Sequence, residues 1–256
     1  MERLKVRDKY FYYNCLGSGS EGNVYSYNGK YAIKVFPDYI WTHNGLTLKK
    51  RKRKMQKVEA MMSLRDPSAA FPLGFAKVPG REPAYYMEEV RRTNRNHPKD
   101  LVDCLHEKYD DKTEEILVKA DAALQRIHKL GVAVGDIKEN NILLRDGREP
   151  VYVDLDNAIY QGFMYDLIPD RAGCLFKIYG GSAIAHQDND ILLFALMALH
   201  MKTKDDRFSF RECKLSIAEG LHQLKKDDKE TKEILKCIFS DAENKPYIGK
   251  VLHKIH

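Results

Sequence analysis

The chain has 256 residues, of which 43% are apolar, and its formal net charge is +6. This length can build one substantial core or two smaller lobes, and the composition is normal for a soluble globular protein. The longest apolar run, Ile191–Leu199, is less than half of the roughly 20 residues that a membrane-spanning helix needs. The N-terminal MERLKVRDKY has no apolar signal region, so we expect neither a membrane protein nor a secreted one.

The cysteines give an odd count and no C-x-x-C spacing, which disfavours both a disulfide framework and a zinc site. They are Cys15, Cys104, Cys174, Cys213 and Cys237. We therefore expect a reducing, intracellular and cytoplasmic setting.

A glycine-rich segment, LGSGSEGNVY, is the first recognisable feature of the chain and covers Leu16–Tyr25. The dipeptide Asn28-Gly29 follows it, between the segments NVYSY and KYAIKVF. Asn-Gly between such segments is the strongest short hairpin signal. The sequence therefore predicts an antiparallel hairpin that joins the glycine-rich segment to the strand of Lys34.

Six consecutive basic residues, 49–54, begin the next predicted helix. They are open to three interpretations: a solvated helix start, a nuclear-import signal, or an anion-binding patch. Delivery into a host cell is also compatible with them. The helix continues with one acid, Glu59, before Asp66. Its apolar face is predicted to comprise Met55, Val58, Met62 and Leu64.

Two strands and a long helix are predicted next. Phe71–Pro79 and Pro83–Arg92 are typical of strands, and the turn Pro79-Gly80 separates them. The helix is predicted over Lys112–Gly131 because apolar residues recur at intervals of three or four and Gly131 is a typical helix stop. These apolar residues are Ile116, Ala120, Leu124 and Ile127.

The segment Val132–Asp156, VAVGDIKENNILLRDGREPVYVDLD, carries the groups of a metal-assisted phosphoryl-transfer site. Asp136 precedes Lys138 and Asn141, and Asp154 ends a short apolar strand. Phosphoryl transfer requires a carboxylate that orients the acceptor hydroxyl, a nearby cation, and oxygen ligands for Mg²⁺. An amide and a second carboxylate, Asn141 and Asp154, could supply these ligands.

These motifs resemble those of protein kinases. The segment around Asp136 is similar to the catalytic loop H-R-D-L-K-x-x-N, Asp154 matches the acid of D-F-G, and YAIKVF resembles the V-A-I-K strand. The spacing G-x-G-x-x-G-x-V of the phosphate-covering loop is met by Gly17, Gly19, Gly22 and Val24.

The resemblance implies an α+β protein with the two-lobed kinase fold. Residues 1–90 would form a small, mainly antiparallel β lobe, and residues 91–256 a larger, mainly helical lobe. Asp190 begins a segment that resembles the buried helix beneath the family's catalytic loop. The last segment is similar to the family's closing helices, with Cys237, Asp241 and Pro246 in place.

The resemblance also implies roles for individual residues. The expected catalytic residues are Asp136, Lys138, Lys34 and Glu59, the last as the ion-pair partner of Lys34. The expected nucleotide contacts are Leu16, Gly17, Gly19, Gly22, Val24, Ala32, Lys34, Met87, Glu88, Val90 and Leu143. Asn141 and Asp154 are the expected metal ligands, with ATP and Mg²⁺ as cofactors and Mn²⁺ as an alternative cation.

The implied activity is phosphoryl transfer to serine or threonine of a protein substrate, because Lys138 accompanies that specificity in the family. We expect a monomer, and we do not expect nucleic-acid binding, because the aromatic residues fall at strand and core positions. Small compact kinases of bacteria or viruses that act inside host cells have a similar build.

Several departures from the family pattern leave alternatives open. Val134 and Gly135 replace the family's histidine and arginine, so activity should not require phosphorylation of the activation segment. Asp156 replaces the glycine of D-F-G and is either a further metal ligand or a solvated side chain. The segment VDLDNA also resembles small-molecule kinases of the aminoglycoside and choline type, and the missing A-P-E motif allows a noncatalytic pseudokinase.

Overall fold

The computed structural model describes residues 3–6, 14–19, 22–36, 48–79, 81–91, 100–106, 110–163 and 187–203. It is an α+β protein, as predicted, with a mainly antiparallel mixed sheet and several helices. The chain divides into two compact units, Met1–Arg91 and Arg92–His256.

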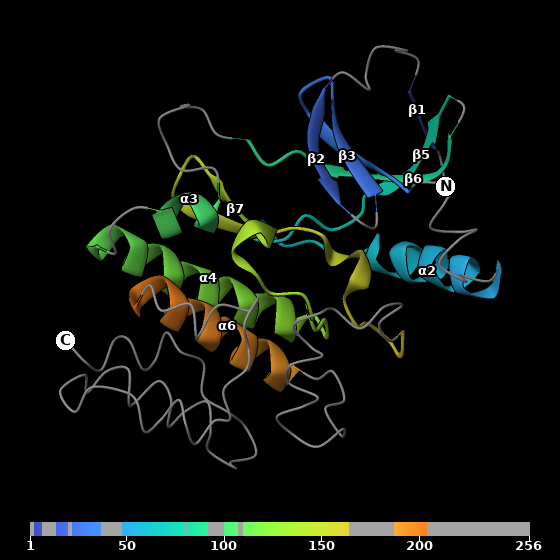
Figure 1. Cartoon of the computed structure of the whole chain (residues 1–256). Coiled ribbons are helices and arrows are strands. Elements are labelled where there is room, and N and C mark those ends of the chain that lie inside the picture. Colours follow the sequence, from blue (N-terminus) through green and yellow to red (C-terminus); the bar gives the residue numbers. More distant parts are fainter. Residues whose placement is uncertain are drawn as a thin grey trace. The chain divides into compact units, whose positions relative to one another are not determined.

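The first unit is built on a six-stranded sheet (Figure 1). Its strands are β1 (Leu4–Lys5), β2 (Cys15–Gly19), β3 (Gly22–Tyr27), β4 (Tyr31–Val35), β5 (Gly74–Val78) and β6 (Arg81–Glu88). Their spatial order is β1-β5-β6-β4-β3-β2. All neighbouring pairs are antiparallel except β1 and β5, which are parallel.

The predicted hairpin is formed by β3 and β4. Asn28 and Gly29 both adopt positive φ angles, 53° and 56°. Two successive residues of this kind make the type I′ turn, whose twist matches that of the flanking strands. The register pairs Val24 with Lys34, so the hairpin places the strand of the glycine-rich segment directly beside Lys34.

The core of the first unit lies on one face of this sheet. Alternating residues of the central strands point into it, as the two-residue period of a strand requires. The cluster consists of Val6, Tyr25, Ile33, Val35, Ala76, Val78 and Ala84. Helix α2 (Leu48–Met61) belongs to the same unit and buries Val58 and Met61. Strand β4 is buried on both faces, because Ala32 and Lys34 are covered as well as Ile33 and Val35.

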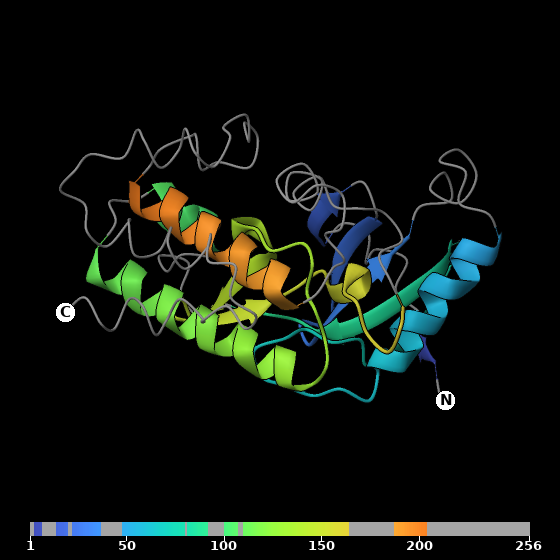
Figure 2. The same ribbon diagram turned by 90° about the horizontal axis from the view of Figure 1, so that it is seen from below.

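The second unit combines helices with a two-stranded sheet. Its elements are α3 (Leu101–His106), α4 (Asp111–Lys129), the 3₁₀ helix η2 (Glu139–Asn141), β7 (Ile142–Arg145), β8 (Glu149–Tyr152), the 3₁₀ helix η3 (Leu155–Asn157) and α6 (Gln187–Thr203). Helix α4 packs against β8 and lies beside α6 (Figure 2).

Helix α4 has clear end signals. The side chain of Asp110 caps its first turn, with Oδ1 accepting hydrogen bonds of 2.9 Å from both the backbone N and Oγ1 of Thr113. These hydrogen bonds lower the pKa of Asp110, because they favour the ionised carboxylate. At the other end Gly131 donates its N–H to the carbonyl of His128, which terminates the helix where the sequence predicts.

Helix α6 is apolar on nearly every side. Ile191, Leu193, Phe194 and Leu199 are all buried although they lie at widely different angles around the helix axis. A helix that is hydrophobic all round belongs in the interior of its unit. None of the helices in the described part of the chain is long and apolar enough to cross a membrane.

Some predictions fall on residues outside the described ranges. These are the part of the activation segment over residues 164–186, which includes Cys174, and the closing helices with Cys237, Asp241 and Pro246.

Candidate active site

Three of the expected catalytic-loop residues form one polar network in the second unit. The carboxylate of Asp136 accepts a 2.6 Å contact at Oδ2 from Nζ of Lys138. Asn141 donates from Nδ2 to the same oxygen at 3.0 Å and to the backbone carbonyl of Asp136 at 2.9 Å. The Asp136 side chain is mostly buried, with 13% exposed. The loop thus holds a partly accessible carboxylate against a cation and an amide.

The orientation of the Asn141 amide follows from these contacts. Both atoms of Asp136 that it contacts are acceptors, so the amide nitrogen faces Asp136. Its oxygen, Oδ1, is then directed elsewhere and could bind a cation. The short helix η2 sets this side chain in place, since the Asn141 N–H bonds the carbonyl of Lys138 at 2.9 Å.

The hairpin of β7 and β8 brings Asp154 close to Asn141. Ile142 pairs with Tyr152 in the register, and the N–H of Val153 donates to the carbonyl of Asn141 at 2.9 Å. Asp154 is the next residue and lies in the left-handed region, with φ 62° and ψ 40°. Such angles are uncommon outside glycine and cluster at functional sites, where the surrounding structure offsets their cost.

The predicted oxygen ligands are consistent with Mg²⁺. This ion commonly uses one or two carboxylates together with phosphate oxygens of the substrate. Asn141 and Asp154 supply an amide oxygen and a carboxylate from adjacent chain segments. Within the described ranges, no group of three or more His, Cys, Asp and Glu side chains is arranged to hold a metal ion.

Asp156 is fully buried in η3. The interpretation of Asp156 as a solvated side chain is therefore wrong. A carboxylate is placed in an interior only where its interactions offset the loss of hydration.

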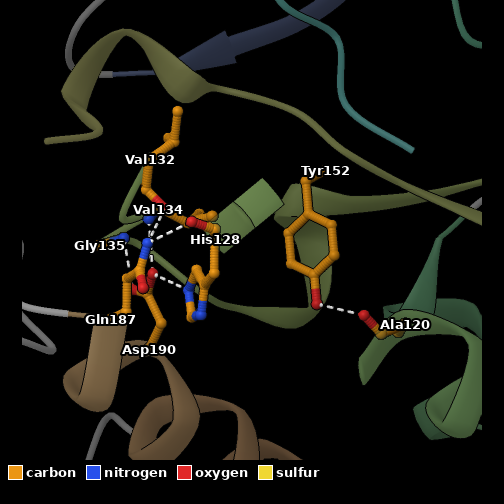
Figure 3. A network of polar contacts seen from close by, with 8 residues as sticks. All are labelled: Ala120, His128, Val132, Val134, Gly135, Tyr152, Gln187 and Asp190. Carbon is orange, nitrogen blue, oxygen red and sulfur yellow. Dashed lines mark hydrogen bonds and ion pairs between the residues drawn. The ribbon is translucent and has the colours of Figure 1, made fainter. Parts of the chain in front are cut away.

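The backbone that precedes Asp136 is held by a buried carboxylate on α6. Asp190 accepts hydrogen bonds from the backbone N of Val134 at 2.6 Å and of Gly135 at 2.7 Å. Its Oδ2 also lies 2.9 Å from Nε2 of His128. Figure 3 shows the Asp190 side chain between the loop backbone and the His128 ring. Gln187, one turn earlier on α6, donates to the carbonyl of His128 at 2.6 Å.

This geometry gives a reason for Gly135. Its φ is 80°, a value that favours glycine over any residue with a Cβ. The family's arginine at this position is absent, and the residue present suits the backbone angle. The sequence shows that the arginine is missing, whereas the reason for glycine at this position lies in the backbone angle.

In the first unit, Lys34 lies on β4 and is buried. Its cross-strand neighbours are Val24 on β3 and Tyr85 on β6. Its Nζ is 5.7 Å from the centre of the Phe36 ring, a cation–π distance.

The three glycines of the glycine-rich segment differ in their surroundings. A Cβ on Gly22 would lie 2.6 Å from the backbone oxygen of Val35, and its φ is +153°. A Cβ on Gly17 would meet nothing within 4 Å, and one on Gly19 would meet only the Gly22 oxygen at 4.0 Å. The fold itself therefore requires glycine at position 22 but not at 17.

The other expected nucleotide contacts are distributed over the sheet and β7. Ala32 and Met87 are buried cross-strand partners, and Glu88 pairs with Tyr31 at the end of β6. Leu16 is 43% exposed, which is unusual for a large hydrophobic residue among those that the structure describes. Val90 follows β6, and Leu143 lies on β7 opposite Val151; both are half-buried.

The structure does not form the expected ion pair between Lys34 and Glu59. Glu59 is exposed on α2, whereas Lys34 is buried, and no contact joins the two side chains. The covered face of α2 instead carries Lys54 and Lys57 beside Val58 and Met61. These positions have the three- and four-residue spacing of a helix face, so the sequence itself contains the pattern that identifies the covered side of α2.

The basic run is thus not uniform. Lys52 and Arg53 are exposed, while Lys54 is buried with its Nζ 5.1 Å from the Phe36 ring. Lysine can cover apolar surface with its aliphatic stem, which explains how it occupies the inner face of a helix. The interpretation as a solvated helix start is supported for Lys52 and Arg53 and is wrong for Lys54.

A scan against protein-family models finds no match for the chain, and a search of curated proteins finds none either. The functional argument therefore rests on the chain's own residues and on the motifs that resemble those of protein kinases.

Proposed function

We propose that the chain is a two-lobed, kinase-like enzyme that transfers the γ-phosphate of ATP, with Mg²⁺, to serine or threonine hydroxyls of a protein. The observation that carries the proposal is the network of Asp136, Lys138 and Asn141. Asp190 supports this network through the backbone of the residues just before it.

Asp136 is assigned the role of orienting the acceptor hydroxyl and taking its proton. Its remaining exposure allows a hydroxyl to reach the carboxylate, and its contacts with Lys138 and Asn141 hold it in one orientation. Lys138 supplies positive charge where negative charge develops on the transferring group. When bound, Mg²⁺ would offset the charge of the phosphates, with Asn141 and Asp154 as its protein ligands.

The nucleotide contacts are assigned to the glycine-rich segment and Lys34. The open space above Gly17 supports this assignment, because backbone N–H groups there can approach phosphate oxygens closely. Lys34 would pair with the α- and β-phosphates, as the resemblance implies.

A small-molecule acceptor is the second candidate. The observation that favours it is Asp156, which is buried two residues after Asp154 in the segment that resembles small-molecule kinases. The contact between Lys138 and Asp136 favours the protein substrate, because those kinases usually lack this lysine.

The test compares wild type with Asp136→Asn, using γ-labelled ATP and Mg²⁺, a cell lysate and, separately, a panel of small alcohols. We expect label in protein serine or threonine from wild type. The variant should bind ATP normally but transfer about 10²–10⁴-fold more slowly, because its amide cannot accept the proton.

Equal transfer by the two proteins would contradict the role of Asp136. Label in a small alcohol alone would replace the protein acceptor with the second candidate. Nucleotide binding without transfer to any acceptor would leave the pseudokinase interpretation in its place.

A further inference from the structure

Helix α6 contacts the catalytic loop at two points. Near its start, Asp190 holds the backbone of Val134 and Gly135. Ten residues later, Nδ1 of His200 lies 3.3 Å from Oε1 of Glu139. Ten residues of α-helix span roughly 15 Å, so the loop is held before and after Asp136 by well-separated side chains of one rigid element.

The second contact is a buried one. The side chains of His200 and Glu139 are 12% and 9% exposed. Because a carboxylate oxygen only accepts, Nδ1 of His200 carries the hydrogen. A glutamate in such surroundings needs hydrogen-bond partners, since an unsatisfied buried carboxylate is costly. The contact therefore restrains the conformation of Glu139.

Glu139 is the first residue of η2, and Asn141 is the last. The carbonyl of Glu139 accepts the N–H of Ile142, which closes the turn. Asn141 in turn donates to both the side chain and the backbone of Asp136. Because η2 is one short turn, a shift of Glu139 would also move Asn141, whose side chain holds Asp136.

We propose that His200 and Glu139 are positioning residues that set Asn141 for cation binding in the nucleotide complex. The inference rests on the proposed function, in which Asn141 is a ligand of Mg²⁺. Side chains that orient a ligand typically change metal affinity by 10–100-fold when they are removed.

The test compares His200→Leu, His200→Asn and Asn140→Ala with wild type. His200→Leu removes the donor, while His200→Asn keeps an N–H donor at the δ position. Asn140→Ala changes an exposed residue of the same 3₁₀ helix and is the matched control. For each protein, the rate of transfer is measured against Mg²⁺ concentration at saturating ATP.

We expect His200→Leu to raise the half-saturating Mg²⁺ concentration roughly tenfold or more, with a smaller change in the limiting rate. His200→Asn and Asn140→Ala should remain close to wild type. A loss of limiting rate with unchanged Mg²⁺ dependence, or equal loss in the Leu and Asn variants, would overturn the positioning role.

Hydrogen exchange at the backbone N–H groups of Asn141 and Ile142 separates this inference from the proposed function. These groups close η2, so their exchange should be faster in His200→Leu than in Asn140→Ala whether or not the protein transfers phosphate. Equal exchange would refute the restraint on η2 directly. An inactive wild type with faster exchange in His200→Leu would refute only the proposed function.

Discussion

The glycines of the glycine-rich segment serve two different purposes. Gly22 is needed by the fold, because a Cβ there would collide with the backbone oxygen of Val35 in the adjacent strand. Gly17 has open space around the position of a Cβ. Glycine within a strand often marks a bulge or a position that a ligand approaches closely, and the register of β2 is irregular between Cys15 and Gly17. Under the proposed function, the phosphate group of the nucleotide is the ligand that approaches Gly17.

Substitution by alanine separates these purposes. Gly22→Ala is expected to lower the free energy of unfolding by about 1–3 kcal/mol, because the backbone must shift to relieve the contact. Gly17→Ala should change the free energy of unfolding by less than about 0.5 kcal/mol but weaken ATP binding. Urea unfolding and equilibrium nucleotide binding measure the two effects. Equal destabilisation by both variants would show that Gly17 also has a structural role.

Glu59 gives the sharpest difference between family expectation and structure. Because its side chain is exposed and makes no contact with Lys34, Glu59→Gln should leave the transfer rate and nucleotide affinity unchanged. Lys34→Met keeps the buried aliphatic stem and removes the charge. It should weaken ATP binding by about tenfold or more, since a hydrogen bond to a charged group contributes about 1.5–3 kcal/mol. A parallel loss in Glu59→Gln would mean that the ion pair forms in the nucleotide complex.

The reason that some site residues could be predicted and others could not is the distance along the chain. Asp136, Lys138 and Asn141 lie within six residues of one another, so their spacing nearly determines their contacts. A contact from Lys34 to α2 depends on the rotation of that helix about its axis. Basic residues cover most of two turns of this helix, so the distribution of polar residues does not indicate which side of the helix is buried. The buried side carries Lys54 and Lys57, where Glu59 was predicted to lie.

At the scale of elements, β8 and α4 are joined by a buried hydrogen bond, in addition to the ion pair between Lys119 and Glu149. The Tyr152 O–H donates to the carbonyl of Ala120 at 3.0 Å (Figure 3). Tyr152 is fully buried, and its desolvation raises the pKa of the phenol well above its ordinary value, with the nearby charges of Asp121 and Asp190 acting in the same direction. The folded unit therefore holds this tyrosine in its neutral form.

This pKa shift predicts a loss of stability in alkaline solution. The unfolded chain releases the Tyr152 proton near pH 10, whereas the folded chain retains it, so the contribution is complete below about pH 10 and declines as the pH rises further. Tyr152→Phe should cost about 1 kcal/mol at pH 7 through the lost hydrogen bond. Above pH 10 the variant should lose stability less steeply than wild type. Parallel curves of unfolding free energy between pH 7 and 11 would contradict the assigned shift.

Regular local patterns predicted the larger elements. The β3–β4 hairpin and α4 are confirmed, because a turn dipeptide and an apolar period identify them. The helix α6 is also present where the family resemblance implies one, from Asp190 onward. The parallel pairing of β1 with β5 was not predicted. Strand β1 has two residues, too few to show the alternating pattern of a strand, and its partner strand lies about 70 residues away in the sequence. The rigid support that α6 gives to the loop through Asp190 was expected only from the family resemblance.

For the molecule as a whole, the proposed function divides the nucleotide contacts between the two compact units. Lys34 belongs to the first unit, and Asp154 to the second. A ligand that binds only the folded state at 100 times its dissociation constant stabilises that state by about 2.7 kcal/mol. For a chain of this size, this corresponds to a rise in Tm of about 5–10 °C.

We therefore expect ATP with Mg²⁺ to raise the Tm of wild type and to raise the Tm of Lys34→Met and Asp154→Asn by about half as much or less. Asparagine suits the left-handed angles of residue 154, so the second variant removes the charge while keeping the backbone. Thermal unfolding with ATP alone, Mg²⁺ alone and both distinguishes nucleotide binding from metal binding. An ATP-induced rise that is reduced in Lys34→Met but keeps its full size and its Mg²⁺ dependence in Asp154→Asn would confine the nucleotide contacts to the first unit. That result would contradict the metal assignment, because an acid that binds the nucleotide's cation must affect the stability gained from it.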